Sequence, residues 1–172
     1  MKNCKLIIIA AVSTDGIIGI NEQMPWRIPE DFKHFRNTTM GSMLLVGYNT
    51  YLTLPEKAFE GREYIVIGGK NRQHIERPEV YKFSNLQDVL ELLDSPNNDI
   101  EKIFIAGGTM IYDSLIDYCD EAYITWVDIN VPNGNKMFPI VKLLTTFEVE
   151  TDADWQLSKT GMKYRIVKYR KK

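Results

Sequence analysis

Three unbroken apolar segments that end in glycine constrain the fold of this chain more than any other feature. They are residues 43–47, which end at Gly47, 64–68, which lead into Gly68-Gly69, and 102–106, which lead into Gly107-Gly108. Continuous runs of Val, Ile and Leu are typical of strands buried on both faces, as in parallel sheets covered by helices. A fourth apolar run, Leu6–Val12, is too short to cross a bilayer, and we interpret it as another interior strand.

The rest of the pattern completes an α/β element order. Helices are predicted where apolar residues follow helical spacing, and strands where apolar residues alternate or run unbroken. We expect helices at 30–39, from about 49, at 86–93 (opened by a capping box at Ser84-Asn85-Leu86-Gln87) and at 109–116, further strands at 80–83, 122–127, 147–155 and 162–169, and a long loop at 13–27. The predicted fold is a mostly parallel central sheet with an antiparallel C-terminal edge, flanked by about four helices.

Size and composition limit the classes of function. With 172 residues, 44% of them hydrophobic, the chain is predicted to form one domain over 1–172. A net charge of −2 without long charged runs argues against a nucleic-acid surface, and we expect no membrane segment. Cys4 and Cys119 have neither metal-ligand spacing nor a disulfide pattern, so we predict no metal site and a cytoplasmic location. His34 and His74 are isolated, and we interpret both as surface residues.

Asp31 is the first candidate for a functional side chain. Pro29 opens a helix on which Asp31, Phe32 and Phe35 follow, and Asp31 and Phe35 lie about one turn apart. A carboxylate at the edge of an aromatic face is costly to desolvate unless a partner neutralises it. Spacing alone leaves two interpretations open: an acidic residue favoured by the helix dipole, or the anchor of a cationic or multiply donating ligand.

The glycine turns indicate a second ligand. In open α/β sheets ligands collect outside the carboxyl ends of the strands, and glycine there lets the backbone approach an anion closely. Thr50 and Thr109 would add hydroxyl donors, and Lys70 and Arg72 could meet an extra phosphate. The sequence therefore predicts a site for a diphosphate-bearing cofactor. Because the glycine pattern of a standard Rossmann site is absent, the site should have another architecture.

At this point the chain resembles the dihydrofolate reductase family over essentially its full length. The most specific match is the run from Ile18-Gly19-Ile20 through Met24-Pro25-Trp26-Arg27-Ile28-Pro29-Glu30-Asp31-Phe32, which is similar to the family's active-site loop and substrate-binding helix. The other matches follow in the family's order: Gly47 to Thr50 at a pyrophosphate turn, Gly61-Arg62 at the site for the glutamate tail, Ile105-Ala106-Gly107-Gly108-Thr109 at a turn with a cis peptide bond, Thr125 in a Tyr-Ile-Thr-Trp strand, and Phe138-Pro139.

The resemblance implies reduction of 7,8-dihydrofolate to 5,6,7,8-tetrahydrofolate by hydride transfer from NADPH, in support of one-carbon and thymidylate metabolism. It further implies a monomeric enzyme in which residues 41–99, approximately, form an adenosine-binding subdomain. Asp31 would pair with two adjacent N–H groups of the pterin and raise the basicity of its N5, while the proton arrives through water. Arg62 is a planar fork suited to the carboxylate of the substrate tail.

The resemblance also assigns residues to three groups. The catalytic group is Asp31, Met24, Trp26 and Thr125. The substrate-binding group is Ile9, Ala10, Asp31, Phe32, Phe35, Leu54, Arg62, Ala106, Tyr112 and Thr125. The cofactor-binding group is Ala11, Ile18, Gly19, Gly47, Tyr48, Asn49, Thr50, Ile67, Gly68, Gly69, Lys70, Arg72, Ala106, Gly107, Gly108, Thr109, Met110 and Ile111.

The chain departs from the family's usual pattern at several positions. Tyr48, Asn49 and Met110 stand where basic residues often contact cofactor phosphates, so the expectation of NADPH over NADH depends on Lys70 and Arg72. Asn135 stands where an aspartate often holds the active-site loop closed, and an amide oxygen is expected to accept those bonds more weakly. Two alternatives stay open: a reductase acting on a ribosylated pyrimidine, and a pterin- or nucleotide-binding protein without turnover.

Overall fold

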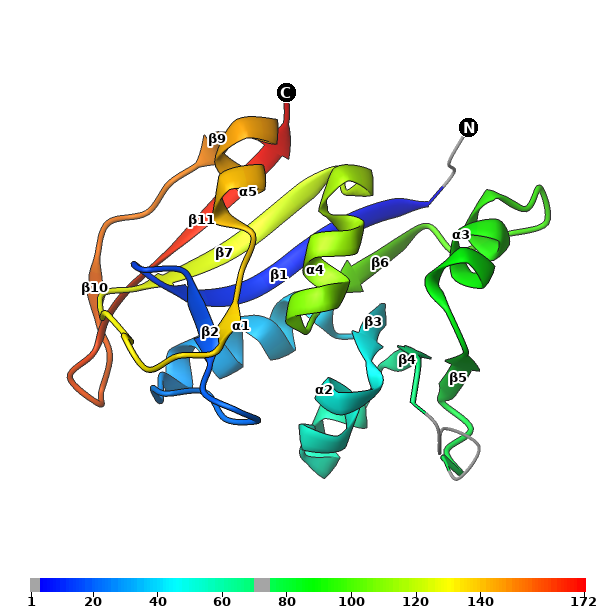
Figure 1. Ribbon diagram of the computed structural model, residues 1–172, viewed down its shortest axis with the longest axis horizontal. Coiled ribbons are helices and arrows are strands. Elements are labelled where there is room, and N and C mark those ends of the chain that lie inside the picture. Colours follow the sequence, from blue (N-terminus) through cyan, green and yellow to red (C-terminus); the bar gives the residue numbers. More distant parts are fainter. Residues whose placement is uncertain (1–3, 70–74) are drawn as a thin grey trace.

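A twisted, mostly parallel sheet with helices on both faces forms the protein in the computed structural model, which describes residues 4–69 and 75–172 (Figure 1). The described residues contribute nine strands to this sheet, in the order β10-β11-β7-β1-β6-β3-β4-β5, with β9 also paired to β11. The strands are β1 (Lys5–Ser13), β3 (Met43–Gly47), β4 (Glu63–Ile67), β5 (Val80–Phe83), β6 (Lys102–Ile105), β7 (Glu121–Val127), β9 (Phe147–Thr151), β10 (Gln156–Leu157) and β11 (Lys163–Lys171). A separate pair joins β2 (Ile17–Gly19) to β8 (Lys136–Met137).

The strand directions confirm the predicted fold class. Strand β1 pairs in parallel with β6 and β7, and β3 pairs in parallel with β4 and β6. Strand β11 runs antiparallel to β7, β9 and β10 and forms the C-terminal edge. The carboxyl ends of β1, β3, β4 and β6 therefore meet at one edge of the sheet, where ligands of α/β proteins bind.

Two hydrophobic layers fill the space between the sheet and its helices. One layer packs α3 (Leu86–Asp94), α4 (Thr109–Leu115), the short helix η3 (Ile116–Tyr118) and α5 (Ile140–Thr146) against the sheet. The opposite layer receives Phe35 from α1 (Pro29–Thr39), Tyr48 and Tyr51 from α2 (Tyr48–Thr53) and Phe59 from η1 (Glu56–Phe59). No helix of the described residues is long and apolar enough to cross a membrane.

Four local predictions were wrong. Helix α5 was missed because only seven residues form it, and β2 lies within the segment predicted as a loop, where its pairing with β8 stabilises it. The strand expected at 147–155 ends at Thr151 as β9, and β10 begins at Gln156, outside the predicted range. The cap of α3 is Asn85, whose Oδ1 accepts the backbone N–H of Asp88 at 3.0 Å, so no Ser84 capping box forms.

The start of α1 is fixed by a hairpin from the other end of the chain. Glu30 accepts a hydrogen bond from the Ser158 hydroxyl at 2.7 Å and another from the Lys159 backbone N–H at 2.9 Å. The Thr160 hydroxyl donates to the carbonyl of Arg27 at 2.6 Å. The turn between β10 and β11 thus holds the first turn of α1, and with it the position of Asp31.

Candidate active site

Asp31 projects from the first turn of α1 toward β7. Its Oδ1 accepts a hydrogen bond from the Thr125 hydroxyl at 2.6 Å, and Thr125 itself is only 2% exposed. Its second oxygen, Oδ2, accepts no hydrogen bond from the described residues. Thr125 thus fixes one edge of a partly buried carboxylate and leaves acceptor capacity for a ligand.

Opposing effects determine how readily Asp31 ionises. Burial raises the pKa of Asp31 above its ordinary value of 3.8, while the hydrogen bond from Thr125 and the nearby His34 lower it. Burial is the largest of these effects because a carboxylate loses hydration on the apolar side of the sheet. A ligand that donates two N–H groups would replace that hydration and favour the ionised form.

His34 was wrongly predicted as a surface residue. It is half-buried, its ring centroid lies 6.2 Å from that of Tyr123, and Nδ1 lies 3.3 Å from the Thr38 hydroxyl. Its pKa is lowered by burial and raised by the charge of Asp31. The sequence offered a usable signal, since a residue three positions after Asp31 shares its helix face.

The apolar residues predicted to line the substrate site divide between the two layers. The layer under α1 brings together the members Ile9, Phe35, Leu54 and Ala106. Phe32, next to Asp31, is 49% exposed, and Met24 is 42% exposed. Ala10 and Tyr112 lie in the opposite layer, where the Tyr112 hydroxyl donates to the carbonyl of Ile9 at 2.8 Å and burial raises the pKa of Tyr112.

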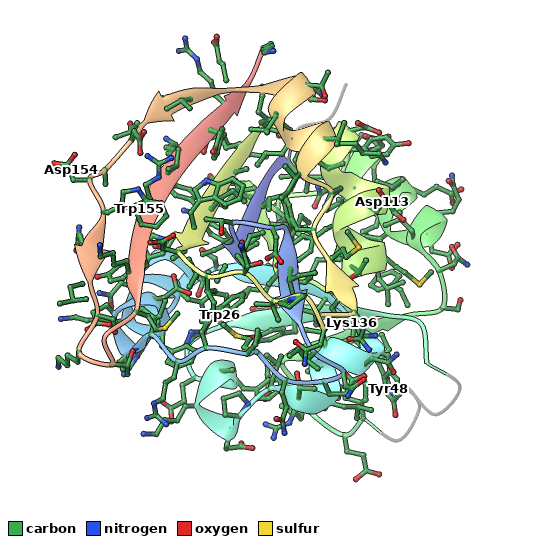
Figure 2. All side chains as sticks on the ribbon, turned by 60° about the vertical axis from the view of Figure 1, so that its left-hand side comes forward. Trp26, Tyr48, Asp113, Lys136, Asp154 and Trp155 are labelled. Carbon is green, nitrogen blue, oxygen red and sulfur yellow. The ribbon has the colours of Figure 1, made fainter. Side chains whose placement is uncertain are left out.

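Trp26 belongs to the segment that joins β2 to α1. Its ring is buried, and Nε1 has no hydrogen-bond partner among the described residues. Figure 2 shows Trp26 and Lys136 in the lower half of the view, on the side where α2 lies. The ring packs against Ile28 and Val127, and a buried N–H of this kind is normally satisfied by water or a ligand, so Trp26 retains an unused donor.

The segment after β2 is held by a pair of amides. Asn135 Oδ1 accepts the backbone N–H of Asn21 at 2.7 Å, and Asn135 Nδ2 donates to Asn21 Oδ1 at 2.9 Å. Asn21 adopts a positive φ of 53°, which asparagine tolerates better than most residues. The amide of Asn135 therefore makes a second bond that a carboxylate, lacking a donor, could not make in this way.

Arg62 is a buried cation without a carboxylate partner in the part of the chain that the structure describes. It is 5% exposed, its Nη2 lies 3.4 Å from the carbonyl of Lys57, and its Nε is buried without a partner there. Gly61 before it has a φ of +68°, and a Cβ on Gly61 would stand 2.5 Å from the sulfur of Met40. The positive φ favours glycine at this turn, and the guanidinium behind it retains capacity for an anionic group.

The glycine turns after β3 and β6 meet at the carboxyl edge of the sheet. The backbone N–H of Gly47 donates to the carbonyl of Gly107 at 2.9 Å, and the peptide bond between Gly107 and Gly108 is cis. A Cβ on Gly108 would lie 3.0 Å from the hydroxyl oxygen of Thr50. The Thr109 hydroxyl is buried and has no partner among the described residues. Close backbone approach and an unused hydroxyl donor fit a phosphate-bearing cofactor.

The neighbouring turn after β4 is closed by an aromatic ring. Tyr48 lies against Gly69, where any Cβ would collide with the Tyr48 ring, and Gly68 and Gly69 both have positive φ. Met110 is 81% exposed at the start of α4. Lys70 and Arg72 lie outside the described residues, so the expected contact to the extra phosphate stays a prediction.

The remaining predicted cofactor residues are placed as follows: Ala11 on β1, Ile18 and Gly19 on β2, Asn49 on α2, Ile67 on β4 and Ile111 on α4.

The fold and site together define a class of protein: an α/β protein whose glycine turns fit a phosphate-bearing cofactor beside a partly buried carboxylate. The comparisons give the family, because the family model for dihydrofolate reductase matches residues 5–171. The chain belongs to the dihydrofolate reductase family.

Curated relatives agree with this assignment. The chain is 31% identical over 166 residues to the dihydrofolate reductase of Mycobacterium tuberculosis (strain ATCC 25618 / H37Rv), covering 94% of this chain and 95% of the relative. It is 32% identical over 167 residues to that of Neisseria gonorrhoeae, with 96% and 97% covered. It is 35% identical over 122 residues to that of Mycoplasma genitalium, with 70% and 74% covered.

Proposed function

We propose that Asp31 anchors the pterin ring in the reaction that this enzyme catalyses, the reduction of 7,8-dihydrofolate to 5,6,7,8-tetrahydrofolate with NADPH. The observation that carries the proposal is the hydrogen bond from Thr125, which fixes one oxygen of Asp31 and leaves Oδ2 for the ligand. Two adjacent N–H groups of a pterin match a carboxylate in bidentate geometry. The pairing orients the ring and increases electron density toward its N5.

The other active-site residues bind the rest of the substrate and control water. Arg62, whose Nε lacks a partner among the described residues, would pair with the tail carboxylate of dihydrofolate. The buried Nε1 of Trp26 would hold a water near the pterin, through which the proton reaches N5. Phe32 and Met24, both exposed, would be covered when the substrate binds and would exclude further water.

NADPH, when bound, supplies the hydride. The residues that would hold it are those at the two joined turns, Gly47, Thr50, Gly107, Gly108 and Thr109. Support comes from the buried, unpartnered Thr109 hydroxyl and from the room that Gly107 and Gly108 leave. We further propose that residues 41–99, approximately, bind the adenosine half, with Lys70 and Arg72 reading its extra phosphate.

We also propose a monomer that binds no nucleic acid and works in the cytoplasm. The balance of 21 basic and 23 acidic residues supports the absence of nucleic-acid binding, because nucleic-acid surfaces carry an excess of positive charge. A reducing compartment is supported by Cys119, whose buried thiol donates to the carbonyl of Leu115 at 3.2 Å. Size-exclusion chromatography with light scattering tests the monomer.

The decisive experiment follows NADPH oxidation with dihydrofolate and, in parallel, with a ribosylated aminopyrimidine. Turnover with dihydrofolate alone is expected. Turnover only with the pyrimidine would identify the related reductase instead, and binding of both ligands without turnover would identify a binding protein. Asp31→Asn, which keeps the shape of the side chain, should lose activity by roughly a hundredfold or more, since the charge-assisted pairing is lost. An unaffected variant would refute the role assigned to Asp31.

A further inference from the structure

His34 lies on the same helix face as Asp31. Asp31 and His34 are three residues apart on α1, which makes their side chains neighbours. This face packs on β7, where Asp31 contacts Thr125 and the His34 ring lies near Tyr123. Tyr123 and Thr125 are two positions apart and point to the same side of the strand. The fold thus places an imidazole and the anchoring carboxylate in one layer over the sheet.

The hydrogen bonding of His34 is incomplete. Its Nδ1 is 3.3 Å from the Thr38 hydroxyl, one turn further along the helix. Its Nε2 is buried and has no partner among residues 4–69 and 75–172. A buried ring nitrogen without a partner costs free energy unless water or a ligand satisfies it. The ring nitrogen Nε2 of His34 therefore has no role in the fold that the described residues show, and none in the mechanism proposed above.

Asp31 acts electrostatically on this imidazole from one turn earlier in α1. On β7 the facing side chain is Tyr123, and its register partner on β1 is the apolar Ile9. On β11 the facing cation is Lys168, whose Nζ lies 5.6 Å from the Tyr123 ring centroid. Lys168 is itself balanced by two carboxylates, at 2.7 Å from Glu150 and 3.8 Å from Glu121. The pKa values of Asp31 and His34 accordingly respond to each other.

We propose that His34 is a positioning residue for Asp31, which it keeps ionised as the solution becomes acidic. Burial lowers the pKa of His34, so the imidazole is neutral at neutral pH. As the pH falls His34 gains a proton, and its charge then favours the carboxylate form of Asp31. Dihydrofolate binding consequently persists to lower pH than Asp31 alone would allow. The inference rests on the proposed role of Asp31 as pterin anchor.

The coupling itself is tested without substrate, by NMR titration of the His34 ring in the unliganded protein. The chain has only two histidines, so His74→Gln assigns the signals. In Asp31→Asn the pKa of His34 should fall by about half a pH unit, roughly a threefold change in its ionisation constant. An unchanged His34 titration would overturn the inference. Because this measurement needs no turnover, it is separate from the test of the pterin anchor.

The consequence for catalysis is tested by the pH dependence of KM for dihydrofolate. Gln at position 34 retains a polar amide but cannot take up a proton. In His34→Gln the rise of KM on the acid side should begin about half a pH unit higher than in the parent enzyme. His74→Gln is the matched control, and its curve should coincide with that of the parent. A His34→Gln curve that also coincides would show that the imidazole has only a packing role.

Discussion

The Thr125 hydroxyl donates to Asp31 Oδ1 at 2.6 Å, although the two residues are 94 positions apart in the chain. Helix α1 supplies the carboxylate and β7 supplies the hydroxyl that orients it. The bond favours the ionised form of Asp31 against the effect of burial. The pair is therefore the unit on which we propose that pterin binding depends.

Removing the Thr125 hydroxyl should lower kcat/KM most at acidic pH. Thr125→Val keeps the shape of the side chain but removes a bond to a charged group, which is worth about 1.5–3 kcal/mol. We expect kcat/KM to fall at least roughly tenfold and, because the pKa of Asp31 rises, the loss to grow as the pH is lowered. Thr125→Ser restores the donor and should restore both values. A pH-independent loss would show that Thr125 acts only through packing.

Substitution of Arg62 should weaken binding of the substrate tail and change little else. Arg62→Leu should raise KM for dihydrofolate about a hundredfold, since a charge-assisted pairing is lost. The same variant should leave turnover of a pterin that lacks the glutamate tail unchanged. Because the described residues give Arg62 no carboxylate partner and only one long hydrogen bond, to the carbonyl of Lys57 at 3.4 Å, the melting temperature should fall little. Arg62→Lys keeps the charge but not the planar fork, so its KM for dihydrofolate should lie between those of the parent and of Arg62→Leu.

The contributions of the two hydrogen bonds between Asn21 and Asn135 can be distinguished by substitution. Asn135→Ala loses both bonds to Asn21, whereas Asn21→Gly tolerates the positive φ and loses only the side-chain bond. At about 1 kcal/mol for each bond, backbone hydrogen exchange at residue 21 should rise roughly fivefold in Asn21→Gly and more in Asn135→Ala. Both effects should be insensitive to salt, since neutral amides are not screened as charges are. Exchange in Asn21→Gly equal to that of the parent would contradict a contribution from the bond between the two side chains.

Glu30 should contribute stability that disappears in acid. Hydrogen bonds from Lys159 and Ser158 lower the pKa of Glu30 below its ordinary value of 4.5. A lowered pKa in the folded state means that the contribution is complete above that ordinary value and is lost as the pH falls through the folded-state pKa. Glu30→Gln should therefore have a lower melting temperature than the parent near neutral pH, and the difference should shrink below pH 4.5. A difference that stays constant with pH would rule out the carboxylate as its source.

Much of the fold could be predicted because its signals are local. Unbroken apolar runs identified β1, β3, β4 and β6, and Pro29 located the start of α1. Strands β2 and β8 could not be found in this way, because each is very short and is stabilised by pairing with the other. Helix α5 was missed because it is short and its N-terminus carries no side-chain cap that would mark its start.

The sequence by itself determined the parallel sheet, the glycine turns and the helix that carries Asp31, since each depends on residues close together in the chain. The tertiary structure decided what surrounds Asp31: Thr125 from β7, and His34 turned inward onto Tyr123. It also left Arg62, Trp26 and Thr109 with buried donors that lack partners among the described residues. The physical reason is that burial and hydrogen bonding depend on which distant segments pack together, and no local pattern records that.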